Sequence, residues 1–134
     1  MVLRSFIYSL VMWIVLGLLA IANGSLREFG IKKFVGEPWA HHISVVTGII
    51  IIFLATLIFF KIFKSLFSLK DAVLIGLCWV ILTVAFEFLF GHYVTGHSWD
   101  ELVQQYDILS GNLWLVALVA IGLSPWAALR MLRS

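Results

Sequence analysis

The sequence has few charged residues and almost no cysteine. Of its 134 residues only 12% are charged, whereas an average soluble domain has about 25%. Cys78 is the single cysteine, which excludes an intramolecular disulfide, a CxxC redox motif and a cysteine zinc site. The net charge of +2 is too small to indicate a nucleic-acid partner. These absences favour a membrane protein over a soluble enzyme or a nucleic-acid-binding protein.

Hydrophobic residues make up 63% of the chain, and its mean hydropathy is +1.09. A membrane-spanning helix needs about 20 apolar residues, and four such stretches occur, at 3–22, 41–63, 71–92 and 112–131. The first stretch also resembles a signal peptide, but its apolar run is longer than usual for one, so we expect a retained helix. The chain therefore predicts one all-α domain over residues 1–134, a polytopic membrane protein with an up-down-up-down four-helix bundle.

The basic residues predict the orientation of this bundle. With both termini in the cytoplasm, six would lie inside and three outside, which agrees with the positive-inside rule. The inner six are Arg4, Lys61, Lys64, Lys70, Arg130 and Arg133, and the outer three are Arg27, Lys32 and Lys33.

The connection between the last two spans, residues 92–110, contains no Lys or Arg. Ser98 and Glu101 have the spacing of a capping box, which begins a helix. Leu102, Val103 and Tyr106 would give that helix an apolar side. We therefore expect a short interfacial amphipathic helix over 99–108. Trp114, at the start of the last span, suits the aromatic belt.

Glu87 is a carboxyl group within the third hydrophobic stretch. Placing such a group inside a membrane helix costs about 2.5–3.5 kcal/mol on insertion scales. Arg27 is the natural ionic partner, because a guanidinium can bind a carboxylate through two hydrogen bonds, and His41 is a second candidate. Two interpretations stay open: an ion pair that holds helices in register, and a site for a ligand, a proton or an ion.

The predicted topology brings the unusual polar residues to the outer end of the bundle. We expect a polar pocket there with Glu87 at its floor. Its candidate residues are Glu87, Arg27, Asn23, Glu28, His41, Ser44, Thr47, His92, Tyr106 and Asp107.

Three further classes of function stay open on these residue types. The four histidines are possible ligands of haem or a metal ion, but His41 and His42 are adjacent, and neither HExxH nor ExxH spacing occurs. No cofactor is therefore expected, and haem is a minor possibility. A lipid-modifying enzyme has suitable residue types without a diagnostic spacing. A transporter or channel using Glu87 would need an oligomer, since four helices are too few to enclose a pathway.

Several local sequences resemble those of a group of small, uncharacterised bacterial proteins with four spans. The resemblance rests on Asn23-Gly24-Ser25-Leu26-Arg27-Glu28, on His41/His42 with Ser44 and Thr47-Gly48, on Phe86-Glu87-Phe88, and on the segment from Gly96 through Tyr106-Asp107 to Trp114. It implies a bacterial inner membrane and no particular activity. We therefore expect a non-enzymatic membrane protein that binds a ligand or acts as an accessory subunit, with the bilayer, other membrane subunits or a second copy as partners. An oligomeric transporter or channel that uses Glu87 for proton or cation coupling is the alternative.

Overall fold

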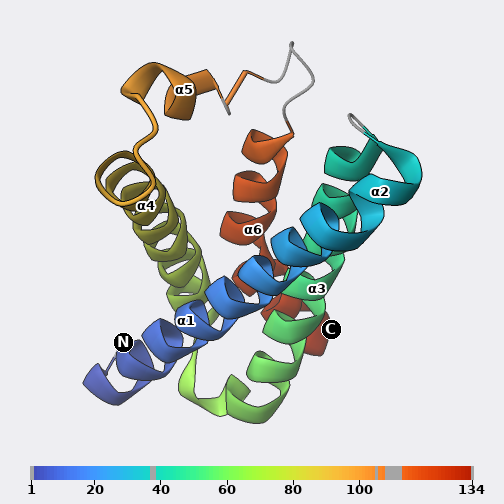
Figure 1. The fold of residues 1–134 in the computed structure, drawn as a ribbon. Coiled ribbons are helices and arrows are strands. Elements are labelled where there is room, and N and C mark those ends of the chain that lie inside the picture. The colour runs from blue at the N-terminus through green and yellow to red at the C-terminus, as the bar shows by residue number, and fades with distance from the viewer. Residues whose placement is uncertain (1, 37–38, 105, 108–112, 134) are drawn as a thin grey trace.

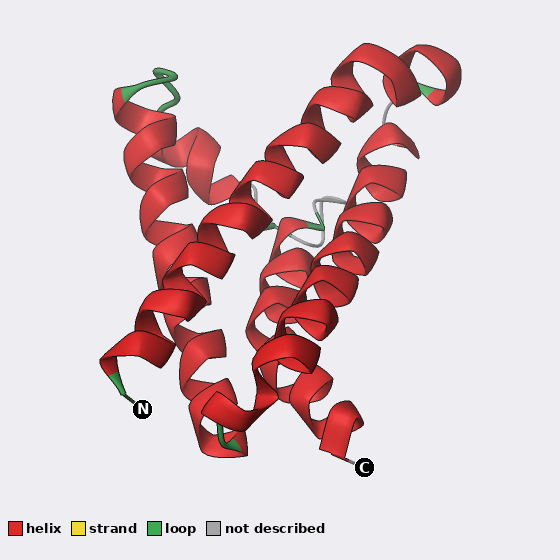
Figure 2. Ribbon diagram, turned by 90° about the horizontal axis from the view of Figure 1, so that it is seen from below, coloured by secondary structure: helices red, strands yellow, loops and turns green. Residues whose placement is uncertain are grey.

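A computed structural model of the chain describes residues 2–36, 39–104, 106–107 and 113–133, except for the side chains of residues 28 and 32. The described chain is 90% helix and has no strand (Figure 1; Figure 2). Its elements are α1 (Leu3–Leu26), a π-helix (Arg27–Ile31), α2 (Lys32–Val35), α3 (Trp39–Phe63), a 3-10 turn (Lys64–Leu66), α4 (Leu69–Tyr93), α5 (Trp99–Gln104) and α6 (Trp114–Arg133).

Four of the described helical segments, those containing α1, α3, α4 and α6, are long and apolar enough to cross a membrane. They match the four stretches expected from the sequence, so the all-α class is confirmed. Many large apolar side chains on these helices are exposed, which suits helices surrounded by lipid.

Helix α6 is the central element of the bundle. It packs against both α3 and α4, while α1 packs along α3 and meets α4 over a shorter stretch (Figure 1). Two indole groups join α1 to α4: Trp79 Nε1 donates to the carbonyl of Ser9 and Trp13 Nε1 donates to Thr83 Oγ1, both at 3.0 Å. These bonds fix the rotation of α4 about its axis, and therefore the face on which Glu87 lies.

The backbones of α4 and α6 approach each other closely at two glycines. A Cβ atom added to Gly76 would overlap the carbonyl oxygen of Gly122. Only residues without a side chain allow so close an approach, as at other helix crossings in membrane proteins. The crossing therefore determines how the two helices diverge toward α5 (Figure 1).

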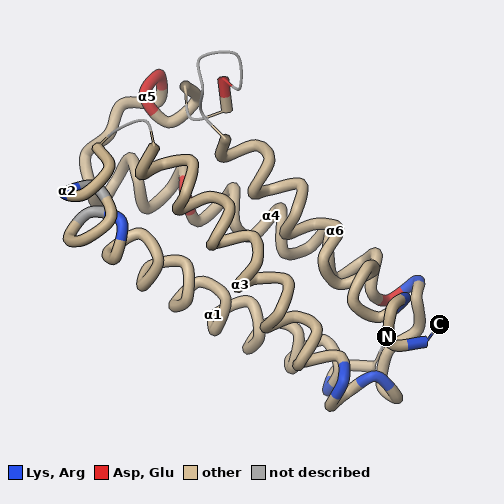
Figure 3. Tube along the Cα trace, turned by 90° about the vertical axis from the view of Figure 1, so that its right-hand side faces the viewer, with Lys and Arg blue, Asp and Glu red and all other residues tan. Residues whose placement is uncertain are grey.

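Hydrogen bonds gather both termini and the α3–α4 turn at one end of the bundle. Ser5 Oγ donates to the carbonyl of Leu66 at 3.4 Å, and the guanidinium of Arg133 donates to the carbonyls of Lys64 and Phe67. Figure 3 shows both termini at this end, with most of the Lys and Arg residues nearby and α2 and α5 at the opposite end. This distribution agrees with the basic-residue pattern of the sequence.

Two helix ends differ by four residues from the sequence-based prediction, and the other helix boundaries differ by no more than two. The first span was expected over 3–22, but α1 continues to Leu26, and the Asn23 amide donates to the carbonyl of Ser44 on α3 instead of ending the helix. The helix expected over 99–108 is α5, which ends at Gln104. Its capping box is confirmed: the amide of Glu101 donates to Ser98 Oγ at 3.1 Å.

Candidate functional site

Three polar side chains from three separate elements meet near the end of α4 that is followed by α5. Glu87 lies on α4, about 9 Å along the axis from the last residue of that helix at 1.5 Å per residue. Tyr106 lies in the turn after α5, and Trp114 is the first residue of α6. The Tyr106 hydroxyl and the Trp114 indole N–H are the side-chain groups that act most strongly on the Glu87 carboxyl.

Each of these side chains has a buried polar atom without a hydrogen-bond partner in the structure. The atoms are Glu87 Oε2, Tyr106 OH and Trp114 Nε1. The three side chains lie close enough for weak hydrogen-bonding interactions with one another, yet these three atoms make no hydrogen bond of ordinary distance and angle. Burial raises the pKa of the Tyr106 hydroxyl, the Trp114 N–H lowers it, and the Glu87 carboxyl adds to the increase. We refer to Glu87, Tyr106 and Trp114 as the polar cluster.

Ring stacking and a glycine hold Tyr106 in this position. The Tyr106 ring stacks on Phe88, the residue after Glu87, with centroids 5.8 Å apart and planes at 12°. Leu102 of α5 packs against Gly91 of α4, where an added Cβ would lie 2.7 Å from Leu102 Cδ2. Since Leu102 is almost fully buried, α5 is docked on α4 and delivers Tyr106 to Glu87.

An apolar groove leads away from the polar cluster between α4 and α6. Its volume is about 760 Å³, within the range of about 300–1,000 Å³ that is usual for ligand sites. Tyr106 lines it and therefore belongs to both the groove and the polar cluster. The other lining residues are Val73, Leu77, Val80 and Val84 on α4 and Leu115, Leu118, Val119, Gly122, Leu123 and Trp126 on α6. We call it the α4–α6 groove.

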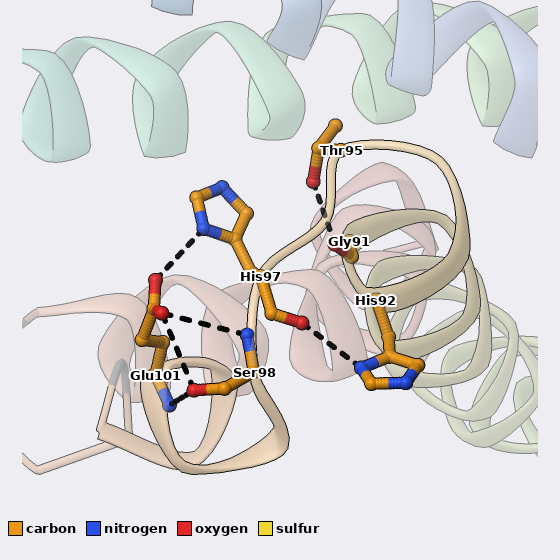
Figure 4. Close-up of polar contacts among 6 residues, drawn as sticks. All are labelled: Gly91, His92, Thr95, His97, Ser98 and Glu101. Atoms are coloured by element: carbon orange, nitrogen blue, oxygen red, sulfur yellow. Dashed lines mark hydrogen bonds and ion pairs between the residues drawn. The ribbon is translucent and has the colours of Figure 1, made fainter.

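His92, another predicted pocket residue, is part of a separate set of contacts between α4 and α5 (Figure 4). Its Nδ1 lies 2.9 Å from the carbonyl oxygen of His97, and its ring stacks on Trp99 at 3.8 Å. His97 Nδ1 lies 3.0 Å from Glu101 Oε2. The hydrogen bond from His97 and the backbone N–H of Ser98 hold the pKa of Glu101 below its ordinary value. These contacts fasten the start of α5 to the end of α4.

Asn23, Ser44 and Thr47 lie together where α1 packs on α3. The Asn23 side-chain amide donates to the carbonyl of Ser44 at 2.8 Å, and Thr47 Oγ1 donates to carbonyls of its own helix. A Cβ added to Gly48 would lie 2.9 Å from Asn23 Nδ2, so Gly48 makes room for the amide. The bond between Asn23 and Ser44 joins α1 to α3, the bonds of Thr47 stay within α3, and none of them includes Glu87.

The remaining predicted pocket residues have mixed outcomes. His41 Nε2 accepts a hydrogen bond from the backbone N–H of Leu113 at 3.0 Å, which ties the start of α3 to the start of α6. Arg27 is half-buried and Asp107 is exposed, and the Glu28 side chain lies outside the described residues. The pairing of Glu87 with Arg27 or His41 stays a prediction.

From the sequence, Trp114 was expected in the aromatic belt and not in the pocket. The available signal was the position of Trp114 in the sequence, directly after the connection that links the span of Glu87 to the last span. The α4–α6 groove had no comparable signal, because its residues read as ordinary lipid-facing positions. Among the described residues, no group of three or more His, Cys, Asp or Glu side chains is arranged to hold a metal ion.

Comparison of the chain with protein-family models, with curated proteins and with solved structures finds no match. The fold defines the protein as an all-helical chain with four helices that are long and apolar enough to cross a membrane.

Proposed function

We propose that the protein is a non-enzymatic, multi-pass protein of a bacterial inner membrane, and that it binds a small molecule at the polar cluster, by itself or as an accessory subunit. In this proposal α1, α3, α4 and α6 cross the membrane in alternating directions, both termini are cytoplasmic, and α5 lies at the outer surface. The shared end of the termini and the gathering of Lys and Arg there support this orientation (Figure 3).

The observation that carries the proposal is the meeting of three buried, unpartnered polar atoms at one point. Buried polar groups in proteins are nearly always hydrogen-bonded, and each unpaired one costs about 1–3 kcal/mol. The structural interpretation of Glu87 from the sequence was an ion pair with Arg27 or His41, whereas the described groups nearest its carboxyl, those of Tyr106 and Trp114, are neutral. A binding site can retain polar groups for its ligand although they lower the stability of the protein without the ligand. Three unsatisfied atoms from separate elements are expected at such a site.

Replacing Glu87 by a residue of similar size without polar atoms tests this proposal. Wild type, Glu87→Leu and the control Asp100→Asn, at an exposed carboxylate, would be unfolded in the same mild detergent, and each would be examined by native mass spectrometry for bound small molecules. We expect Glu87→Leu to raise the free energy of unfolding by about 1–3 kcal/mol, because it removes an unsatisfied buried group. We also expect it to lose a molecule that wild type and Asp100→Asn retain.

A structural role for Glu87 predicts the opposite sign of the stability change. Destabilisation by Glu87→Leu, with the same bound molecules in all three proteins, would therefore contradict the proposal. Proton or cation flux in proteoliposomes that Glu87→Leu abolishes would favour the transporter alternative instead.

A further inference from the structure

The α4–α6 groove has the dimensions of a site for a single hydrocarbon chain. Its residues on α4 run from Val73 to Val84 along one helix face, which is about 16 Å at 1.5 Å per residue. That length is close to half of the hydrocarbon core of a bilayer, about 30 Å thick. The groove can therefore hold one lipid tail from one leaflet.

The walls of the groove suit a flexible chain better than another helix. Helices in membranes pack through small residues that let backbones approach closely. Apart from Gly122, the groove is lined by branched and aromatic side chains, such as Leu77, Val119 and Trp126. These side chains would hold a second backbone at a distance, but an alkyl or prenyl tail can pack between them.

The polar cluster at the Tyr106 end of the groove defines the head of the molecule. Tyr106 OH and Trp114 Nε1 are two donors without acceptors, and Glu87 Oε2 is an acceptor without a donor. A hydroxyl group has two lone pairs and one O–H, so a single hydroxyl can accept both hydrogen bonds and donate the third. It carries no charge, and its own burial is compensated by those bonds.

We propose that the α4–α6 groove binds the tail of an uncharged lipid alcohol, whose hydroxyl group lies among Glu87, Tyr106 and Trp114. This inference rests on the proposed function and adds the class of ligand. An ammonium head has donors only and would leave the indole N–H unpaired. A carboxylate or phosphate head has acceptors only and would be repelled by Glu87.

Three probes with the same C18 tail test the assignment of the head group: oleyl alcohol, oleylamine and oleate. Each would be titrated into the purified full-length protein in mild detergent, with binding followed by native mass spectrometry and by the shift in the unfolding temperature. We expect oleyl alcohol to bind tightest. In Tyr106→Phe, which keeps the stacked ring, its affinity should fall about three- to tenfold for the loss of one hydrogen bond. The control Tyr93→Phe, at an exposed tyrosine of α4, should bind as wild type does.

A second pair of variants tests the place of the tail. Val119 lines the groove, whereas Val116 is an exposed valine one turn earlier on α6 that does not. We expect Val119→Phe to abolish binding of oleyl alcohol and Val116→Phe to leave it unchanged. The folding of each variant is checked by its unfolding temperature without ligand.

Three results would overturn the inference: equal affinity for the three heads, unchanged binding in Val119→Phe, or a lipid-free dimer cross-linked through position 119. If oleyl alcohol fails to bind but Glu87→Leu still loses a different retained molecule, the lipid-alcohol assignment is wrong and the proposed function stands. If Glu87→Leu loses no molecule and is destabilised, the proposed function fails as well.

Discussion

Adding one methyl group at the crossing of α4 and α6 should separate the two helices. In Gly76→Ala the new Cβ would overlap the carbonyl oxygen of Gly122 and lie 3.1 Å from its carbonyl carbon. A backbone carbonyl cannot rotate out of the way as a side chain can, so the helices must move apart. Ile75 and Ile121 belong to the same buried cluster and would lose contacts in that movement.

The expected cost is that of overpacking a well-packed core, about 1–3 kcal/mol, which is a large share of a total stability of about 5–15 kcal/mol. Two other glycines give a graded comparison. A Cβ at Gly122 would lie 3.0 Å from Val80 Cγ2, a side-chain atom that can shift, and a Cβ at Gly17 would have no neighbour within 4 Å. Gly122→Ala should therefore cost less than Gly76→Ala, and Gly17→Ala should be neutral or stabilise by up to about 1 kcal/mol through helix propensity.

Reversible unfolding by increasing the proportion of a denaturing detergent in mixed micelles, followed by circular dichroism, measures these differences. The expected order of destabilisation is Gly76→Ala, then Gly122→Ala, then Gly17→Ala. Equal stability of Gly76→Ala and Gly17→Ala would refute the close approach of α4 and α6, and with it the shape of the α4–α6 groove.

Two other predictions concern the ends of the helices. Asn23→Ala should destabilise the protein by about 0.5–1.5 kcal/mol, because it removes the hydrogen bond to the Ser44 carbonyl; no change in unfolding would show that this bond contributes nothing. The pKa of Glu101 is lower in the folded protein than its ordinary value of 4.5, chiefly through the hydrogen bond from His97. Its contribution to the start of α5 is therefore complete above pH 4.5 and is lost as the pH falls through the lowered pKa. Backbone chemical shifts of residues 99–104 during an acid titration should show this loss in wild type but not in Glu101→Gln, and a transition in wild type above pH 4.5 would contradict the argument.

The sequence by itself determined the helices, because the signals that form them are local. A run of about 20 apolar residues must satisfy its backbone hydrogen bonds internally in lipid, whatever its neighbours are. The capping box of Ser98 and Glu101 acts within four residues and was correctly predicted. The end of α1 was not, because the amide of Asn23 has its partner on another helix.

The tertiary structure alone decided which groups meet Glu87. Hydropathy and basic residues predict the end of the bundle at which a residue lies, but not the direction in which a side chain points around the helix axis. That direction depends on the bonds of Trp13 and Trp79 to their neighbouring helices and on the glycine crossing at Gly76. The docking of α5 then brings Tyr106 to Glu87 beside Trp114. Arg27 was the expected partner of Glu87 because opposite charges can be recognised directly in a sequence. The polar cluster arises instead from the packing of α4, α5 and α6, which a sequence does not display.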